Sequence, residues 1–195
     1  MNTQILIPLL AAIAVMIVAG LVIWIAVRRI RSMQLKKKYG PEYDYTLEKL
    51  GDQRTAEAEL KEREKRIHQL EIRDLNAGVK NRYQTDWAEI QGEFVDDPGN
   101  SMERASRLIT EVMIARGFPV EDFEQRIADV SVLYPNFAPK YREANSITLK
   151  NKEGSATTED LRQALLDYRS LFAQLVGPVN ATEPTRQPEK QMEAS

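Results

Sequence analysis

The sequence is dominated at one end by an apolar stretch, ILIPLLAAIAVMIVAGLVIWIAV, which runs from Ile5 to Val27 without a charged side chain. At about 1.5 Å per helical residue, this stretch would extend over about 34 Å, slightly more than the roughly 30 Å hydrocarbon core of a bilayer. Trp24 falls near its far end, where aromatic side chains favour the membrane interface. The sequence therefore predicts a transmembrane helix over residues 5–27.

A cleaved signal peptide is the alternative interpretation of such an N-terminal stretch. Signal peptides begin with a basic region and have a shorter apolar core, followed by small residues at the cleavage site. Residues 1–4 contain no basic side chain, and the basic residues come after the apolar stretch instead. These features favour a retained anchor, with residues 1–4 as a short extracytoplasmic N-terminus.

Residues 28–38 form a basic juxtamembrane segment. Its six positive side chains are Arg28, Arg29, Arg31, Lys36, Lys37 and Lys38. Because positive charge marks the cytoplasmic end of a membrane helix, we expect the N-terminus outside and the rest of the chain in the cytoplasm. The same six residues are candidate membrane-surface residues, since each could gain about 1 kcal/mol near anionic lipids. Alternatively, they only set the topology and bind no particular lipid.

Residues 39–74 are predicted to form a charged helical stalk. Gly40 and Pro41 interrupt the preceding helix, and a helix resumes from about Tyr45, with Gly51 as a weak point. Opposite charges recur at i,i+4 spacing, which stabilises an isolated helix by about 0.2–0.5 kcal/mol per pair. The pairs are Glu57–Lys61, Glu59–Arg63 and Glu62–Arg66. Such a helix could stand in water without a packed partner.

Two features of the stalk allow a second interpretation. Leu60 and Ile67 are seven residues apart, which suits a coiled coil and a homo-oligomer through the stalk, but no apolar seam continues over three heptads. His68 and Glu71 are three residues apart, as in a metal pair. Two ligands on a solvated helix make no site, so we expect an exposed histidine.

Residues 75–176 are predicted to form an all-α bundle of four to five short helices. The clearest apolar stripe has spacings of 4, 4, 3 and 4, which place its members on one face of a helix: Val79, Tyr83, Trp87, Ile90 and Phe94. Trp87 lies at the centre of this stripe and is expected in the core. Four further apolar segments follow, near 102–113, 120–130, 137–148 and 161–175.

Capping residues mark the ends of several of these helices. Asp97 before Pro98 is expected to cap the second helix, with Asn100 or Ser101 as alternative caps. Gly117 is expected to end this helix, and Thr157 to cap the last one. Asp96 and Asp97 could instead form a carboxylate dyad or a Mg²⁺ ligand pair, but capping explains them fully. The tail at 177–195, rich in Pro, Thr, Gln and Glu, is expected to be disordered.

The composition excludes several classes of chemistry. The 195 residues include no cysteine, and the lone His68 lies on the stalk, so no thiolate site or Ser/His/Asp triad can form. No glycine-rich phosphate loop occurs. Residues 75–176 carry 16 acids and 12 bases, and this net charge of −4 disfavours nucleic acid. We therefore predict no catalytic residue, no metal and no cofactor, and do not expect an enzyme.

Four segments resemble a family of bacterial single-pass membrane proteins described as hypothetical or secreted. They are YGPEYDYT (Tyr39–Thr46), WAEIQGEFVDDP (Trp87–Pro98), GFPVEDFEQRIADVSVLYP (Gly117–Pro135) and TEDLRQALLDYRSLFAQL (Thr158–Leu175). The resemblance covers most of residues 35–175. It implies a bacterial source and a membrane anchor, but no activity.

Together these features predict a membrane-anchored, non-enzymatic protein-interaction or scaffold module at the bacterial inner membrane. Its partners would be membrane lipids, through the anchor, and another protein, through the helical domain. Two alternatives stay open: a lipid-surface or envelope structural protein, and a small ligand-binding or enzymatic bundle.

Overall fold

The computed structural model describes residues 3–178, with side chains from Met16 onward, and contains eight α-helices and no strand within that range. The helices are α1 (Thr3–Tyr39), α2 (Pro41–Leu50), α3 (Gln53–Gln69), α4 (Ala77–Glu93), α5 (Pro98–Arg116), α6 (Phe123–Leu133), α7 (Ala138–Lys152) and α8 (Thr158–Val176). The all-α prediction is confirmed. Residues 1–2 of the predicted extracytoplasmic N-terminus and residues 179–195 of the predicted disordered tail lie outside the described residues.

Helices α4 to α8 form the bundle of four to five helices predicted for residues 75–176, and their ends follow the capping residues. The Asp97 side chain accepts a hydrogen bond from the Asn100 N–H at 3.0 Å, with Pro98 as the first helical residue. Thr157 and Asp160 form a reciprocal capping box at the start of α8. Gly117 ends α5 in the left-handed conformation. Local hydrogen bonding thus fixes where these helices begin and end.

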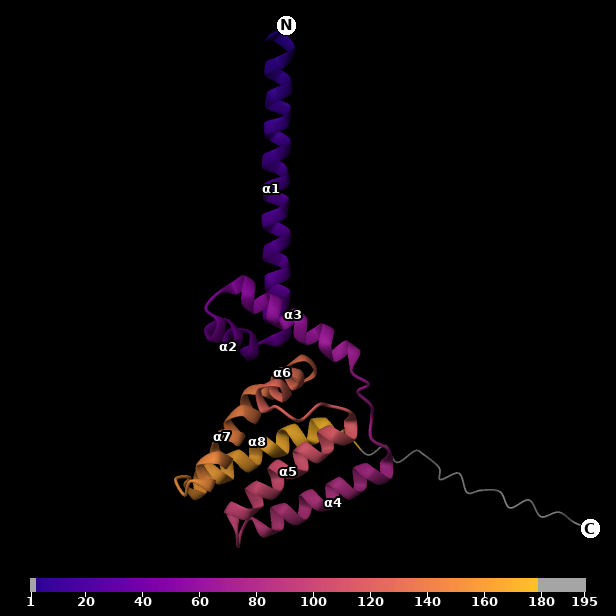
Figure 1. The fold of residues 1–195 in the computed structure, drawn as a ribbon, viewed down its shortest axis with the longest axis vertical. Helices are drawn as coiled ribbons and strands as arrows, with labels where there is room; N and C mark the ends of the chain where they lie inside the picture. Colours follow the sequence, from indigo (N-terminus) through magenta and orange to yellow (C-terminus); the bar gives the residue numbers. More distant parts are fainter. Residues whose placement is uncertain (1–2, 179–195) are drawn as a thin grey trace, which may run out of the picture.

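The core of this bundle is built around α8, which lies against α5 and α7, while α4 covers the other side of α5 (Figure 1). Trp87 is 5% exposed, as predicted for the centre of its stripe. Its ring stacks on Phe172 of α8 with a centroid distance of 4.8 Å. Tyr141 and Tyr168 meet edge to face between α7 and α8. Aromatic pairs therefore join α8 to both α4 and α7 across the core.

Helix α1 projects from the body as a single long rod (Figure 1). The large apolar side chains described on this rod, from Met16 to Met33, are mostly solvent-exposed. Across the described residues, no helix has both the length and the apolar composition that crossing a membrane requires.

The predicted stalk is helical, but it is not free-standing. Gly51, at φ 70°, ends α2 completely, so the chain turns and α3 runs back across the end of α1 and along α6. Leu60 is fully buried against Leu35, Tyr39 and Tyr43, in a small apolar cluster separate from the main core. Ile67 belongs to the main core. Leu60 and Ile67, whose spacing suggested a coiled coil, are therefore both buried by contacts within this chain.

Helix α3 packs on the body, rather than standing free as predicted, because it has a buried stripe that includes an arginine. The buried residues of α3 are Ala56, Leu60, Arg63 and Ile67, at spacings of 4, 3 and 4. Of the three predicted i,i+4 ion pairs, Glu59–Arg63 forms, at 3.0 Å. Arg66 instead pairs with Asp129 of α6 at 2.9 Å. The sequence predicts a solvated, charged helix, but Arg63 and Arg66 instead attach α3 to the rest of the chain.

Candidate functional site

The six candidate membrane-surface residues all lie on the last part of α1, but they divide into two groups. Lys36 forms an ion pair with Asp44 of α2 at 3.0 Å, and Lys38 with Glu64 of α3 at 2.7 Å. Within the described residues, the other four form no ion pair: Arg28, Arg29, Arg31 and Lys37. Lys36 and Lys38 therefore help to attach α1, while the three arginines and Lys37 are available to another ligand.

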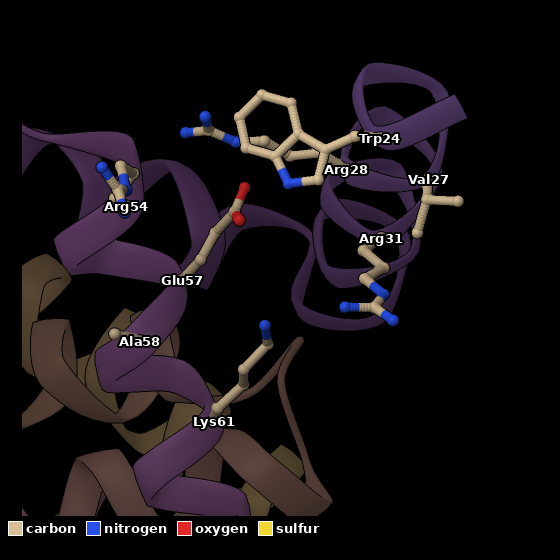
Figure 2. Close-up of a pocket in the computed structure, with 8 residues that line it drawn as sticks. All are labelled: Trp24, Val27, Arg28, Arg31, Arg54, Glu57, Ala58 and Lys61. Carbon is tan, nitrogen blue, oxygen red and sulfur yellow. The ribbon is translucent and has the colours of Figure 1, made fainter. Parts of the chain in front are cut away.

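Helices α1 and α3 enclose a cleft of about 290 Å³ beside the apolar part of α1 (Figure 2). This α1–α3 cleft is lined by Trp24, Val27, Arg28 and Arg31 of α1 and by Arg54, Glu57, Ala58 and Lys61 of α3. Its lining carries four bases and one acid. Arg54 and Lys61 were not predicted as site residues, because only the fold brings them beside the juxtamembrane arginines.

Side chains that line the α1–α3 cleft point toward one another, and two of them are in contact. Figure 2 shows Glu57 and Lys61 reaching from α3 toward α1. The Arg28 guanidinium lies 5.6 Å from the centroid of the Trp24 ring, within the range of a cation–π contact. This contact holds one positive charge directly beside an aromatic ring at the predicted membrane interface.

Glu57, the one acid in the cleft, is held by neighbouring donors. It accepts hydrogen bonds from the Tyr43 hydroxyl at 3.1 Å and from Gln53 Nε2 at 2.8 Å. Burial raises the pKa of Glu57, but hydrogen bonds from Gln53, Ser32 and Tyr43, together with the charge of Lys61, leave it below its ordinary value. The carboxylate is thus ionised at neutral pH, and the cleft keeps a net charge of +3.

A second cleft, of about 450 Å³, lies on another side of α1 and shares Arg28 with the first. Its lining consists of Ile25, Arg28, Arg29, Ser32, Met33 and Gln53. Basic side chains therefore surround α1 as a basic ring just beyond the predicted membrane segment. Helix α3 reaches both clefts, but it contributes bases, Arg54 and Lys61, only to the α1–α3 cleft.

A buried ion cluster attaches the N-terminal helices to the bundle. Glu42 of α2 is fully buried and accepts hydrogen bonds from Arg63 of α3 at 2.9 Å and from Arg142 of α7 at 3.3 Å. The Arg142 guanidinium also lies 3.6 Å from the centroid of the Tyr45 ring. Arg63 donates to the Ser131 hydroxyl of α6 at 3.3 Å. One carboxylate thus joins three helices.

Tyr39, the last residue of α1, contributes a second attachment. Its side chain is fully buried, and its hydroxyl donates to the Leu60 carbonyl at 3.1 Å and to Glu64 at 3.2 Å. Burial, reinforced by the charge of Glu64, raises the pKa of the Tyr39 phenol well above its usual range. The neutral phenol therefore acts as a fixed hydrogen-bond donor at the junction of α1 and α3.

The remaining candidates from the sequence have structural explanations. Asp97 is the N-cap described above, and Asp96 is an exposed neighbour of it. His68 is exposed on α3, as predicted. Within the described residues, no three His, Cys, Asp or Glu side chains gather as metal ligands would. A smaller cleft of about 160 Å³ between α4 and α5 is lined by two acids and two bases among its six residues.

Comparisons with protein-family models, with curated proteins and with solved structures each gave no match to this chain.

Proposed function

We propose that this chain is a membrane-anchored, non-enzymatic interaction or scaffold module, with its helical body at the cytoplasmic face of a bacterial inner membrane. The observation that carries this proposal is the exposure of apolar side chains on α1. Ile17 is 66% exposed, Ile23 63% and Trp24 58%. Apolar side chains that are exposed along a helix favour an apolar environment, and no other element among residues 3–178 covers these.

The charge distribution supports the orientation. The apolar stretch has no basic residue before it and six within the eleven residues after it. In a membrane helix this asymmetry favours a cytoplasmic C-terminal side. The body would then lie in the cytoplasm, directly below the lipid surface.

The attachment of α1 to the body supports a scaffold rather than a tethered, freely moving domain. Tyr39 is buried at the end of α1, and the ion pairs of Lys36 and Lys38 fix the helix to α2 and α3. The Glu42 cluster then fixes α2 and α3 to α7. A continuous set of packed contacts would hold the surface of the bundle at a fixed distance from the bilayer.

The two alternative functions differ in what supports them. A lipid-surface structural protein would use the same anchor and the same basic ring, so it remains the second candidate. A ligand-binding or enzymatic bundle would need a polar cavity within α4 to α8. The cleft between α4 and α5 is small, and its charges balance, so it gives this alternative little support.

The topology is tested by fusing reporters after Ser195 in a bacterial host. Green fluorescent protein should be fluorescent there, and alkaline phosphatase should be inactive. Deleting residues 5–27 should release the chain from carbonate-washed membranes, while deletion of residues 179–195 serves as the control and should leave it membrane-bound. Active alkaline phosphatase would contradict the orientation, and extraction of the full chain by carbonate would contradict the anchor.

A further inference from the structure

We propose that the α1–α3 cleft binds the phosphate-bearing headgroup of an anionic phospholipid, an inference that rests on the membrane anchoring proposed above. The cleft lies where two helices meet beside the apolar part of α1 (Figure 2). Four bases and one acid line it. Its occupant must therefore be anionic and must fit a space of about 290 Å³.

The position of the cleft along α1, at the level of the membrane surface, favours a lipid over other anionic ligands. Trp24 and Val27 lie in the last turn of the apolar stretch, so they mark the level at which α1 would leave the hydrocarbon core. Arg54, Ala58 and Lys61 line the same cleft from α3. The N-terminal half of α3 is consequently placed at the level of the lipid headgroups, whose phosphates are the anions present there at the highest concentration.

The chemistry of the lining suits a phosphate diester attached to acyl chains. An arginine guanidinium can form two parallel hydrogen bonds to phosphate oxygens, and a lysine ammonium adds a compact charge. Trp24 and Val27 supply an apolar wall on the α1 side, against which the glycerol backbone and first acyl carbons can pack. One lining thus matches both the polar and the apolar part of a phospholipid.

Arg54 and Lys61 distinguish this site from a simple basic segment that only sets topology. Both side chains are exposed, and neither forms an ion pair within the described part of the chain. Glu57, which lies between them on α3, accepts its hydrogen bonds from Tyr43 and Gln53. Replacing Arg54 and Lys61 therefore removes positive charge from the cleft without breaking an ion pair that holds the fold together.

The test compares lipid retention by the full chain and by charge variants. The protein is reconstituted in nanodiscs that contain equal amounts of phosphatidylglycerol and phosphatidylcholine, released into mild detergent, and analysed by native mass spectrometry for bound lipid. The test variant is Arg54→Gln with Lys61→Gln. The matched control is Lys140→Gln with Lys152→Gln, which removes the same charge from exposed positions of α7.

We expect the unmodified chain to retain one phosphatidylglycerol in preference to phosphatidylcholine. The Arg54/Lys61 variant should lose this retention by about tenfold, because two interfacial charges are removed, and the Lys140/Lys152 variant should behave like the unmodified chain. Equal retention of both lipids by the unmodified chain, or equal retention by both variants, would overturn the proposal.

Two further arms separate the sources of the signal. Inorganic phosphate is added at millimolar concentration, and displacement of the lipid by it would overturn the assignment in favour of a free-phosphate site. Insertion is measured separately by carbonate extraction of the same samples. A chain that resists extraction but shows no lipid preference contradicts only the headgroup site, whereas a chain that is extracted contradicts the anchor itself.

Discussion

Arg63 donates a hydrogen bond from Nη1 to the carboxylate of Glu42 at 2.9 Å, and both side chains are almost completely buried. Glu42 is thereby enclosed by two guanidiniums, since Arg142 approaches it at 3.3 Å from α7. In such a cluster, removal of one partner leaves the other charge buried without compensation, which typically costs about 3–5 kcal/mol. The contact between the N-terminal helices and the bundle therefore depends on this carboxylate.

Glu42→Gln should lower the free energy of unfolding of the full chain in detergent by about 3–5 kcal/mol, because the buried Arg63 and the partly buried Arg142 lose the carboxylate that they share. Urea denaturation followed by circular dichroism measures this change. Glu62→Gln is the matched control, since Glu62 forms only an exposed pair with Lys65 at 3.7 Å. That pair should contribute less than about 1 kcal/mol. Equal effects of the two substitutions would show that the buried cluster does not stabilise the fold.

The bundle was predictable from its sequence because local signals and burial agree there. The stripe around Trp87, the cap at Asp97 and the capping box at Thr157 each specify a helix by themselves. Packing then follows from the apolar faces, and the structure has five helices where four to five were predicted. The basic residues at the end of α1 were also identifiable, since their position after the apolar stretch is visible in the sequence.

The packing of α3 was not predictable in the same way. Its buried face contains Arg63, and a charged residue in a highly charged segment gives no indication of burial. The partner that makes burial favourable, Glu42, lies in another helix, and Arg142 lies a hundred residues further along the chain. Arg54 and Lys61 were missed for a related reason, because they join the basic ring only after α3 folds back.

A fragment of residues 39–178 should be more stable than one of residues 75–178, because α3 packs on α6. Without α3, Asp129 loses Arg66, its partner at 2.9 Å, and the face of α6 that α3 covers is exposed to water. Both fragments should be helical, but the shorter one should unfold at a lower urea concentration. Asp129→Asn should destabilise the longer fragment, where it removes the ion pair with Arg66, and should have little effect on the shorter one. Coincident unfolding curves for the two fragments would place the domain boundary at Leu75, as the sequence predicted.

Gly117→Ala should destabilise the chain by more than about 1 kcal/mol. Gly117 has a φ of 92°, and a Cβ atom there would lie 2.6 Å from the Glu71 carbonyl oxygen. The substitution therefore strains the end of α5 and displaces the segment that connects α3 to α4. Gly92→Ala, on the exposed part of α4, is the control: it has space for a Cβ and should gain up to about 1 kcal/mol. Thermal unfolding of both variants measures the difference.

Stability should also fall in alkaline solution through Tyr141. Burial raises the pKa of its phenol to about 12, and Arg126 opposes the shift only in part. Since the unfolded chain ionises near its ordinary value of about 10, the stabilisation is complete below about pH 10 and is lost as the pH rises toward 12. Urea midpoints measured across this range should decrease. The decrease should be smaller for Tyr141→Phe, and an unchanged slope would contradict the assignment.

Trp87→Ala should lower the free energy of unfolding by about 3–5 kcal/mol, because it leaves a large cavity beside Phe172, on which the ring stacks at 4.8 Å. Trp24→Ala is the control, since Trp24 is 58% exposed and its removal opens no cavity. In a fragment of residues 39–178, Trp87 is the only tryptophan, so its fluorescence reports its own environment. Emission should be blue-shifted and resistant to acrylamide. Red-shifted, readily quenched emission from a folded fragment would instead place Trp87 on the surface, where aromatic side chains often anchor a partner.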